Sequence, residues 1–429
     1  MTAAPRILIE GGHLIDPANG VDRPGDLAIA HGQIVGVGAA PAGFVVDERI
    51  DARGCVVAPG LVDVCARVRE PGYEHEGMLA SELAAAAAGG VAHLVCPPDT
   101  DPPLDEPGLV EMLQYRARAI DRAHLHPLGA LTRGLRGAEL TEMVQLRQAG
   151  CVAFSQAGWP VPDTQVLLRA LQYAATHGCT VWLRPQDAWL GKGGVAASGP
   201  VATRLGLAGV PVAAETVALF TLFELVRATG CRLHVDRLSS ARGVQLVREA
   251  KAEGLPVTSS VSLHNLRLID VDVGYFDSAY RLDPVLRGQR DRDALAAGLA
   301  DGTIDALCSD HTPVERDAKL LPFAEAEPGA TALELLLPQA LAWAQGQRLP
   351  IARAMEVVTS RAAAVAGLRA GSLAVAGAAD VVVFDPTAAW RVTADALVSH
   401  GKCTPFAGYE VTGQVRCTVI DGHTVHRAR

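Results

Sequence analysis

The segment 151–184, CVAFSQAGWPVPDTQVLLRALQYAATHGCTVWLR, contains the pattern that decides the fold. Two short apolar runs, Cys151–Gln156 and Thr180–Arg184, enclose a longer stretch, Asp163–His177, with the Ala and Leu content and the apolar spacing of a helix. A strand, a helix and a second strand in this order are typical of a parallel sheet whose connections are helical.

The same alternation continues along the chain on both sides of this segment. We expect eight barrel strands, at Leu61–Val68, His93–Pro97, His124–Leu131, Cys151–Gln156, Thr180–Arg184, Arg232–Leu238, Val257–Leu263 and Asp305–Ser309. Helical patterns lie between them, for example at Met78–Gly89, Glu139–Ala149, Gly243–Gly254 and Arg292–Asp301. Eight such alternations predict an α/β fold, a (β/α)8 barrel of the TIM type.

The two ends of the chain have a different rhythm, with short β-rich runs between turn residues. Examples are Arg6–Glu10 and Gln33–Val37 near the start, and Ala379–Asp385 and Val415–Asp421 near the end. We expect both ends to pack together as a small β-sandwich domain beside the barrel. The predicted boundaries are 1–57 and 369–429 for the two parts of this domain and 58–368 for the barrel.

Composition limits the functions that the chain can have. Hydrophobic residues make up 49% of the 429 residues, yet no uninterrupted apolar run reaches the roughly 20 residues that cross a bilayer. The net charge of −9 disfavours nucleic acid and anionic membranes as partners. The first residues lack a signal-peptide pattern, and the nine cysteines are scattered singly. We therefore expect a cytoplasmic protein with reduced thiols.

Polar motifs follow the first, second and last predicted barrel strands, where the working residues of such barrels lie. They are Asp63-Val-Cys-Ala-Arg-Val-Arg69, Pro97-Pro-Asp-Thr100 and Ser309-Asp-His-Thr-Pro313. These motifs resemble those of the dihydroorotases, members of the amidohydrolase superfamily, whose first strand carries Asp-x-His-x-His-x-Arg and whose last carries Asp-His-x-Pro. Further stretches in family order extend the resemblance from about Asp16 to Gly422.

The resemblance implies a site for two divalent metals, usually zinc, held by histidines and acidic groups. The matching positions in this chain are Cys65, Arg67, Gln156, Arg184, Arg237 and Asp310. Arginine cannot ligate a metal, because its guanidinium has five donors, no acceptor and a permanent proton. We therefore expect no metal cofactor, and zinc only if the chain is an active hydrolase after all.

Three arginines facing Asp310 predict a surplus of about two positive charges at the barrel mouth, which would repel a divalent cation. The guanidiniums would then pair with Asp310 in place of the lost metals. Asp310 is either a vestigial catalytic base or a salt-bridge anchor. Cys65 is expected to be an inert buried thiol.

The residues that the resemblance assigns to substrate binding are also altered. Arg69 matches the position that binds a substrate carboxylate, but we favour a structural ion pair for it. Asp99 stands where the family has asparagine, and its charge would repel a carboxylate ligand unless an arginine offsets it. His264 falls near a substrate-contact segment, and His311 is expected to be a hydrogen-bonded core histidine.

Two other sets of residues attract attention as possible ligands. His124-Leu-His126 is a His-x-His motif whose rings share one strand face, but it lies on the third predicted strand, where the family has no ligands. We expect no metal there. His75 and Glu76 follow a Glu-Pro-Gly turn and are expected to be in solvent.

Three functions are compatible with these residues. The first is a non-catalytic subunit, similar to the inactive dihydroorotase-like chains that accompany aspartate transcarbamoylase in some bacteria and support its assembly and activity. Such a chain would form a homodimer or a larger hetero-oligomer with the transcarbamoylase catalytic chain. The second is an active dihydroorotase or related cyclic amidohydrolase. The third is an anion sensor that binds a nucleotide phosphate at Arg184 and Arg237.

Overall fold

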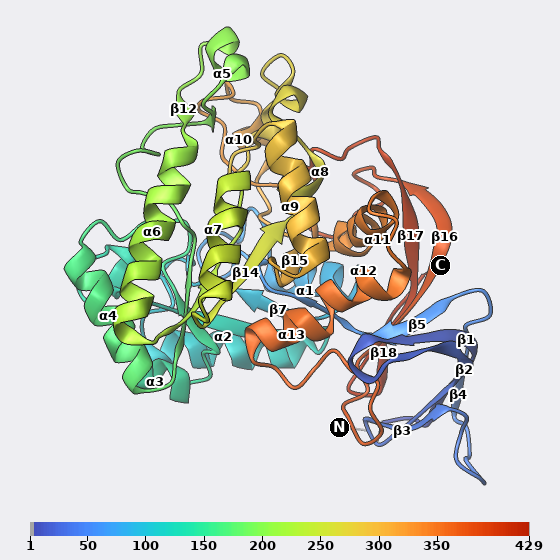
Figure 1. Cartoon of the computed structure of the whole chain (residues 1–429). Helices are drawn as coiled ribbons and strands as arrows, with labels where there is room; N and C mark the ends of the chain where they lie inside the picture. Colours follow the sequence, from blue (N-terminus) through green and yellow to red (C-terminus); the bar gives the residue numbers. More distant parts are fainter. Residues whose placement is uncertain (1–3, 429) are drawn as a thin grey trace.

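The computed structural model describes residues 4–428, which form a barrel and a sheet built from both ends of the chain (Figure 1). Eight parallel strands follow one another around the barrel in chain order. They are β6 (Leu61–Asp63), β7 (Val91–Cys96), β8 (His124–Ala130), β9 (Ala153–Ser155), β10 (Thr180–Leu183), β13 (Arg232–Val235), β14 (Val257–Ser262) and β15 (Ala306–Cys308).

The barrel is nearly closed between its first and last strands. A parallel bridge joins Ala66 to His311 just beyond β6 and β15, and the backbone N–H of Arg67 donates to the carbonyl of His311 at 2.8 Å. The predicted eight-stranded α/β barrel is therefore confirmed.

The strand β6 is shorter than the predicted Leu61–Val68 run. The buried carboxylate of Asp63 accepts the backbone N–H groups of Cys65 (3.2 Å) and Ser309 (3.0 Å). The Asp63 side chain therefore accepts hydrogen bonds from backbone N–H groups that would otherwise pair with a neighbouring strand. The regular strand pairing of β6 ends at Asp63.

Helices follow most barrel strands and cover the outside of the barrel. They are α1 (Leu79–Ala88), α2 (Pro107–Ile120), α3 (Met143–Gln148), α4 (Thr164–Thr176), α6 (Val212–Thr229), α7 (Ala241–Ala252), α8 (Leu263–Arg267) and α9 (Gln289–Asp301). In α4 the Asp163 carboxylate caps the N-terminus by accepting the Gln165 N–H at 2.7 Å. The buried face of α4 has helical spacing and consists of Leu167, Ala170, Leu171 and Ala174.

Shorter elements complete the barrel domain. An excursion of β11 (Ala196–Ala197), α5 (Pro200–Leu205) and β12 (Gly209–Val210) precedes α6 and projects at the top of the view (Figure 1). The remaining helices are α10 (Arg316–Lys319), α11 (Leu336–Gly346), α12 (Ile351–Val358) and α13 (Ser360–Ala366).

Both ends of the chain form one hydrogen-bonded sheet, in which the blue N-terminal strands lie beside the red C-terminal strands (Figure 1). Its strands are β1 (Ile7–Asp16), β2 (Val21–Ala30), β3 (Gln33–Gly38), β4 (Glu48–Asp51), β5 (Val56–Pro59), β16 (Val381–Arg391), β17 (Glu410–Ile420) and β18 (His423–Arg427). The two halves meet where β5 pairs antiparallel with β16. The domain boundaries at 57 and 369 remain a prediction.

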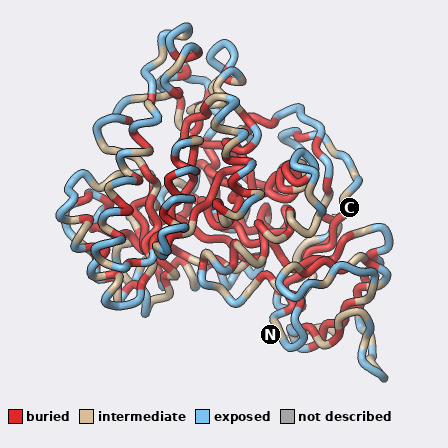
Figure 2. Tube along the Cα trace, viewed as in Figure 1, coloured by how far each residue is buried: buried red, intermediate tan, exposed pale blue. Residues whose placement is uncertain are grey.

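Buried residues fill the barrel and the central strands of the terminal sheet (Figure 2). Val62, Val95, Leu128 and Trp182 belong to one cluster, whereas their strand neighbours Leu61, Leu94, Val181 and Leu183 belong to another. This alternation is expected of strands that have a barrel interior on one side and helices on the other. None of the helices within residues 4–428 is long and apolar enough to cross a membrane.

Candidate functional site at the barrel mouth

The residues that the sequence assigned to a degenerate site gather at the C-terminal ends of the barrel strands. A cavity of about 310 Å³ opens there, and its lining includes Arg67, Asp99, Asp283 and Asp310. The site residues follow their strands directly: Cys65 and Arg67 after β6, Asp99 after β7, Gln156 after β9, Arg184 after β10, Arg237 after β13 and Asp310 after β15.

Arg237 binds two carboxylates at the centre of the mouth. Its Nη1 donates to Asp310 Oδ1 at 2.6 Å, and its Nε donates to Asp236 Oδ2 at 2.8 Å. Burial lowers the pKa of Arg237, but Asp236 and Asp310 outweigh that effect and hold the pKa well above its ordinary value. The guanidinium is therefore a permanent buried cation, clamped by two anions.

Arg67 links the first, second and last strands. Its Nε donates to Asp99 Oδ2 at 2.9 Å, its Nη1 donates to Thr312 Oγ1 at 2.9 Å, and Nη1 also lies 3.8 Å from Asp310 Oδ1. Burial raises the pKa of Asp99, but the charge and hydrogen bond of Arg67, together with the charges of Arg69 and Arg237, outweigh that effect and bring the pKa below its ordinary value. Asp99 is thus an ionised partner of Arg67.

Arg184 pairs with Asp283 and donates to the side-chain oxygen of Gln186. Burial acts to raise the pKa of Asp283, but the charges of Arg184 and Arg237 reverse the effect and lower it. Asp283 is therefore an anion that lies between two guanidiniums.

These contacts correct the predicted charge surplus. Arg67, Arg184 and Arg237 carry three positive charges, whereas Asp99, Asp236, Asp283 and Asp310 offer four carboxylates. The expectation of a net positive mouth was wrong because it counted Asp310 alone. Arg184 and Arg237 are also already bound to carboxylates, with which a nucleotide phosphate would have to compete.

The mouth does not fit the zinc ions that the family resemblance implies. Cys65 Sγ lies 4.0 Å from Asp310 Oδ1, while Arg237 holds the same oxygen at 2.6 Å. Burial raises the pKa of the Cys65 thiol well above its ordinary value, so it carries a proton at neutral pH. A catalytic zinc normally keeps three protein ligands, and the Gln156 amide is engaged with the Thr132 hydroxyl at 2.9 Å.

Arg69 is a buried ion-pair residue, as the sequence favoured. Its Nε donates to the Pro313 carbonyl at 2.8 Å and lies 2.7 Å from Glu76 Oε2, and its Nη2 reaches Glu327 Oε1 at 3.3 Å. Glu76 is buried, which corrects the expectation that it is in solvent. It is buried against Arg69, and nothing in the loop composition signals this.

Two histidines of the barrel have structural surroundings. His311 accepts the Ala332 N–H at Nδ1 (3.0 Å), and its Nε2 lies 2.8 Å from Glu82 Oε2, as expected of a core histidine. His264 stacks on Phe406 with ring centroids 5.8 Å apart, and neither of its ring nitrogens has a hydrogen-bond partner within residues 4–428. Burial lowers the pKa of His264 to about 3, so its ring is neutral.

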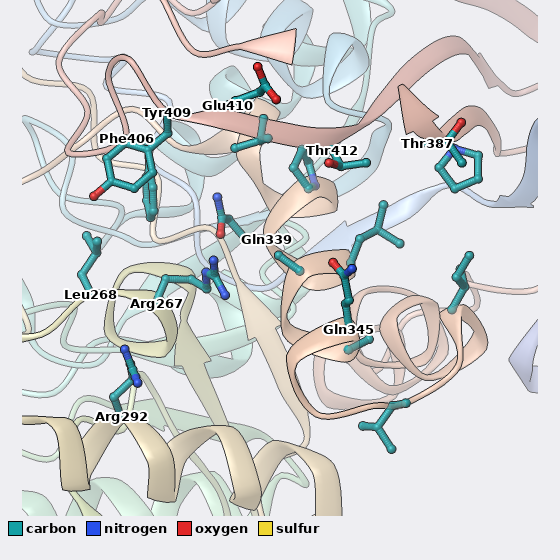
Figure 3. Close-up of a pocket in the computed structure, with 18 of the residues that line it drawn as sticks. Arg267, Leu268, Arg292, Gln339, Gln345, Thr387, Phe406, Tyr409, Glu410 and Thr412 are labelled. Carbon is teal, nitrogen blue, oxygen red and sulfur yellow. The ribbon is translucent and has the colours of Figure 1, made fainter. Parts of the chain in front are cut away.

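A second cavity, of about 850 Å³, lies away from the mouth (Figure 3). Its lining includes Arg267 of α8, Arg292 of α9, Gln339 of α11 and Tyr409 beside β17. Burial lowers the pKa of Arg267. None of the residues that the resemblance assigned to catalysis or metal binding lines this cavity.

Comparison with known proteins agrees with the fold and with the motifs. The family models "Dihydro-orotase-like" and "Amidohydrolase family" match residues 54–242 and 212–425. A dihydroorotase-like protein of Pseudomonas aeruginosa is 46% identical over 98% of this chain and 99% of its own. A dihydroorotase of Geobacter sp. strain M21 is 37% identical over 98% of this chain and 99% of its own.

Solved structures show the same architecture. An L-hydantoinase (dihydropyrimidinase) from Arthrobacter aurescens superimposes with a TM-score of 0.88 over 99% of this chain and 96% of its own, at 23% identity. At this identity the likeness shows the fold alone. The barrel and the relatives together identify an amidohydrolase. The chain belongs to the dihydroorotase-like family of amidohydrolases.

Proposed function

We propose that this chain is a non-catalytic dihydroorotase-like subunit that supports the assembly and activity of aspartate transcarbamoylase in de novo pyrimidine biosynthesis, in the cytoplasm. One observation carries the proposal. Arg67, Arg184 and Arg237 stand at positions of family metal ligands, and each is bound to at least one carboxylate. At the barrel mouth, all three arginines are therefore occupied by ion pairs with neighbouring carboxylates.

Ring opening in this family needs a polarised amide carbonyl and a hydroxide of lowered pKa, both of which a metal supplies. Asp310, the remaining acidic ligand, is held by Arg237 at 2.6 Å. Burial raises its pKa, but a buried carboxyl that faces two guanidiniums supplies neither a Lewis acid nor a hydroxide. This chemistry supports a binding role for the retained fold.

Exposed apolar side chains support a role in assembly. Val217 and Phe220 are three residues apart on α6 and both are exposed. Trp159 and Trp189 are 61% and 69% exposed and line one cavity together with Ala218 of the same helix. Large aromatic groups left in solvent are typical of protein interfaces. We propose this surface, made of these five residues, as the docking face for the transcarbamoylase catalytic chain.

Co-expression with the transcarbamoylase catalytic chain of the same organism, followed by affinity purification and native mass measurement, tests the proposal. We expect one complex of fixed stoichiometry and a transcarbamoylase activity that falls when this chain is omitted. A homodimer of this chain that never associates, next to a transcarbamoylase fully active alone, would sink the proposal.

The alternative is an active dihydroorotase or related cyclic amidohydrolase. The observation in its favour is that relatives 36 to 39% identical over nearly the whole chain are named dihydroorotase. Ring opening of dihydroorotate by the purified chain, with and without added Zn²⁺, discriminates the two. Turnover that survives purification and disappears in an Asp310→Asn variant would establish the alternative.

A further inference from the structure

A cluster of metal-ligating side chains lies at the opposite end of the barrel from the mouth. His93 is the third residue of β7, His124 is the first residue of β8, and Asp380 directly precedes β16. One ligand atom from each lies within 4.8 Å of the others. The sequence interpretation dismissed His124 together with His126 and did not consider His93 or Asp380, which are 287 residues apart.

The carboxylate of Asp380 is oriented by the backbone around it. Its Oδ1 accepts the N–H of Asp421 at 2.9 Å, and its own carbonyl accepts the N–H of Gly60 at 2.8 Å. Oδ2 is thereby left to face both imidazoles, 3.0 Å from His93 Nε2 and 3.5 Å from His124 Nε2. A second carboxylate is also near His124, because Asp421 Oδ2 lies 3.6 Å from His124 Nε2.

These separations match the edges of a zinc coordination tetrahedron. Zinc binds imidazole nitrogen and carboxylate oxygen at about 2.0–2.2 Å, which places neighbouring ligand atoms roughly 3.4 Å apart. The separations of Asp380 Oδ2 from the two imidazole nitrogens, 3.0 and 3.5 Å, bracket that value. Asp421 approaches only His124, at 3.6 Å, and lies outside the group of three residues whose ligand atoms are all within 4.8 Å of one another. A set of two imidazoles and two carboxylates also suits zinc in chemical character.

His126 occupies the place of an outer-shell partner. Its Nε2 lies 3.1 Å from His93 Nδ1, on the same face of the strand as His124. The His126 ring is therefore placed so that its Nε2 can accept the His93 Nδ1–H. That contact would fix the tautomer in which His93 Nε2 offers a lone pair to a metal.

The local charge favours a divalent cation. Asp380 and Asp421 supply two carboxylates, and the charge of Asp121 also acts on both His124 and Asp421. The barrel mouth differs, because there each carboxylate already faces a guanidinium. The N-terminal ends of barrel strands are associated with stability and not with catalysis.

We propose that His93, His124 and Asp380 form a structural zinc site that joins the N-terminal ends of β7 and β8 to the terminal sheet, with Asp421, which lies beside His124, as the fourth ligand once the metal is bound. This goes beyond the proposed function and departs from the sequence-based expectation that the chain binds no metal. Zinc would connect the barrel to the segments that flank β16 and β17, which carry the two carboxylates.

The test is stoichiometric binding to the full chain after chelator treatment and dialysis. Elemental analysis and titration with Zn²⁺ should give one equivalent per chain, a rise in the melting temperature, and with Co²⁺ the visible bands of a tetrahedral site. His124→Gln should abolish the tight equivalent and the rise. Asp421→Asn, at an exposed position, should weaken binding at least tenfold and serves if His124→Gln does not fold.

Two control variants make the outcome specific. His13→Gln removes another His–Asp pair, in which His13 Nε2 lies 2.5 Å from Asp22 Oδ1 and no third ligand completes a cluster within the described residues, and it should leave binding unchanged. Cys65→Ser, at the mouth, should also leave binding unchanged. Absence of a tight equivalent in the parent chain, its persistence in both ligand variants, or its loss in Cys65→Ser would overturn the proposal.

Discussion

Arg237 and Asp310 face each other across the barrel mouth, with Nη1 2.6 Å from Oδ1, and both have left-handed backbones, with φ of 56° and 53°. Non-glycine residues rarely adopt this region, and doing so costs of order 1–3 kcal/mol. Each residue follows the end of a barrel strand, β13 or β15. The strained backbone therefore lies at two positions of the barrel mouth whose side chains bind each other.

The first prediction concerns this pair. Asp310→Asn leaves Arg237 with one carboxylate fewer in a buried position, and we expect the free energy of unfolding to fall by about 3 kcal/mol. Urea denaturation monitored by circular dichroism measures the loss. Asp22→Asn, at an exposed ion pair, is the matched control and should change stability by less than about 0.5 kcal/mol. Equal losses of unfolding free energy in the two variants would contradict a stabilising role of the buried Arg237–Asp310 pair.

The second prediction distinguishes a structural Arg69 from an anion-binding one. Burial raises the pKa of Glu76 to about 7. Arg69→Met leaves this buried carboxyl group without its arginine partner, so we expect the free energy of unfolding to fall by about 3 kcal/mol. The double variant with Glu76→Gln should recover at least about 1 kcal/mol of that loss, because the buried partner is then no longer charged and only the half-exposed Glu327 is left without Arg69. Strictly additive losses would argue against the pairing.

The third prediction is a dependence of stability on pH. The unfolded chain protonates His264 near pH 6.5, whereas burial lowers the folded pKa to about 3. The unfolded state therefore binds the extra proton between these values, and stability falls as the pH drops through that window. His264 alone should contribute about 3 kcal/mol of loss between pH 7 and pH 4.

His264→Leu should flatten this part of the profile, because leucine cannot take up the proton. Unfolding curves at several pH values measure the slope. His75→Leu, at an exposed histidine, is the control and should preserve the slope of the parent chain. An unchanged slope in His264→Leu would show that the ring is accessible to protons in the folded state.

The fourth prediction concerns the docking face. Phe220→Asp places a charge among exposed apolar groups, and should weaken association with the transcarbamoylase catalytic chain by about 2 kcal/mol, roughly thirtyfold. Titration by light scattering or calorimetry gives the affinity. Tyr115→Asp, on α2 and 75% exposed, is the control for a surface charge elsewhere and should bind as the parent does.

The barrel could be predicted from the sequence because its strands are short apolar runs and its helices have helical spacing, as in α4. The end of β6 could not, since the Asp63 carboxylate replaces a backbone hydrogen bond there. The arginines of the mouth could be placed by their position after strands. Of their partners, Asp310 could be predicted, whereas Asp236 and Asp283 could not.

Asp236 illustrates the reason. Neighbouring residues on a strand point to opposite faces, so Asp236 and Arg237 would not be expected to pair. The left-handed backbone at Arg237, just beyond β13, changes that geometry and brings Nε within 2.8 Å of the carboxylate. Backbone conformations of this kind leave no mark on composition or periodicity.

The shared carboxylates at the mouth have a consequence for substitutions at these positions. Asp310 serves both Arg67 and Arg237, and Asp283 lies between Arg184 and Arg237. Replacing any one of these arginines by a neutral residue would leave at least one buried carboxylate with one guanidinium fewer, so we expect each single replacement at the mouth to lower stability. Because the pairs share members, these positions are coupled, and substitutions that remove an arginine together with its carboxylate should cost less than the sum of the two single replacements.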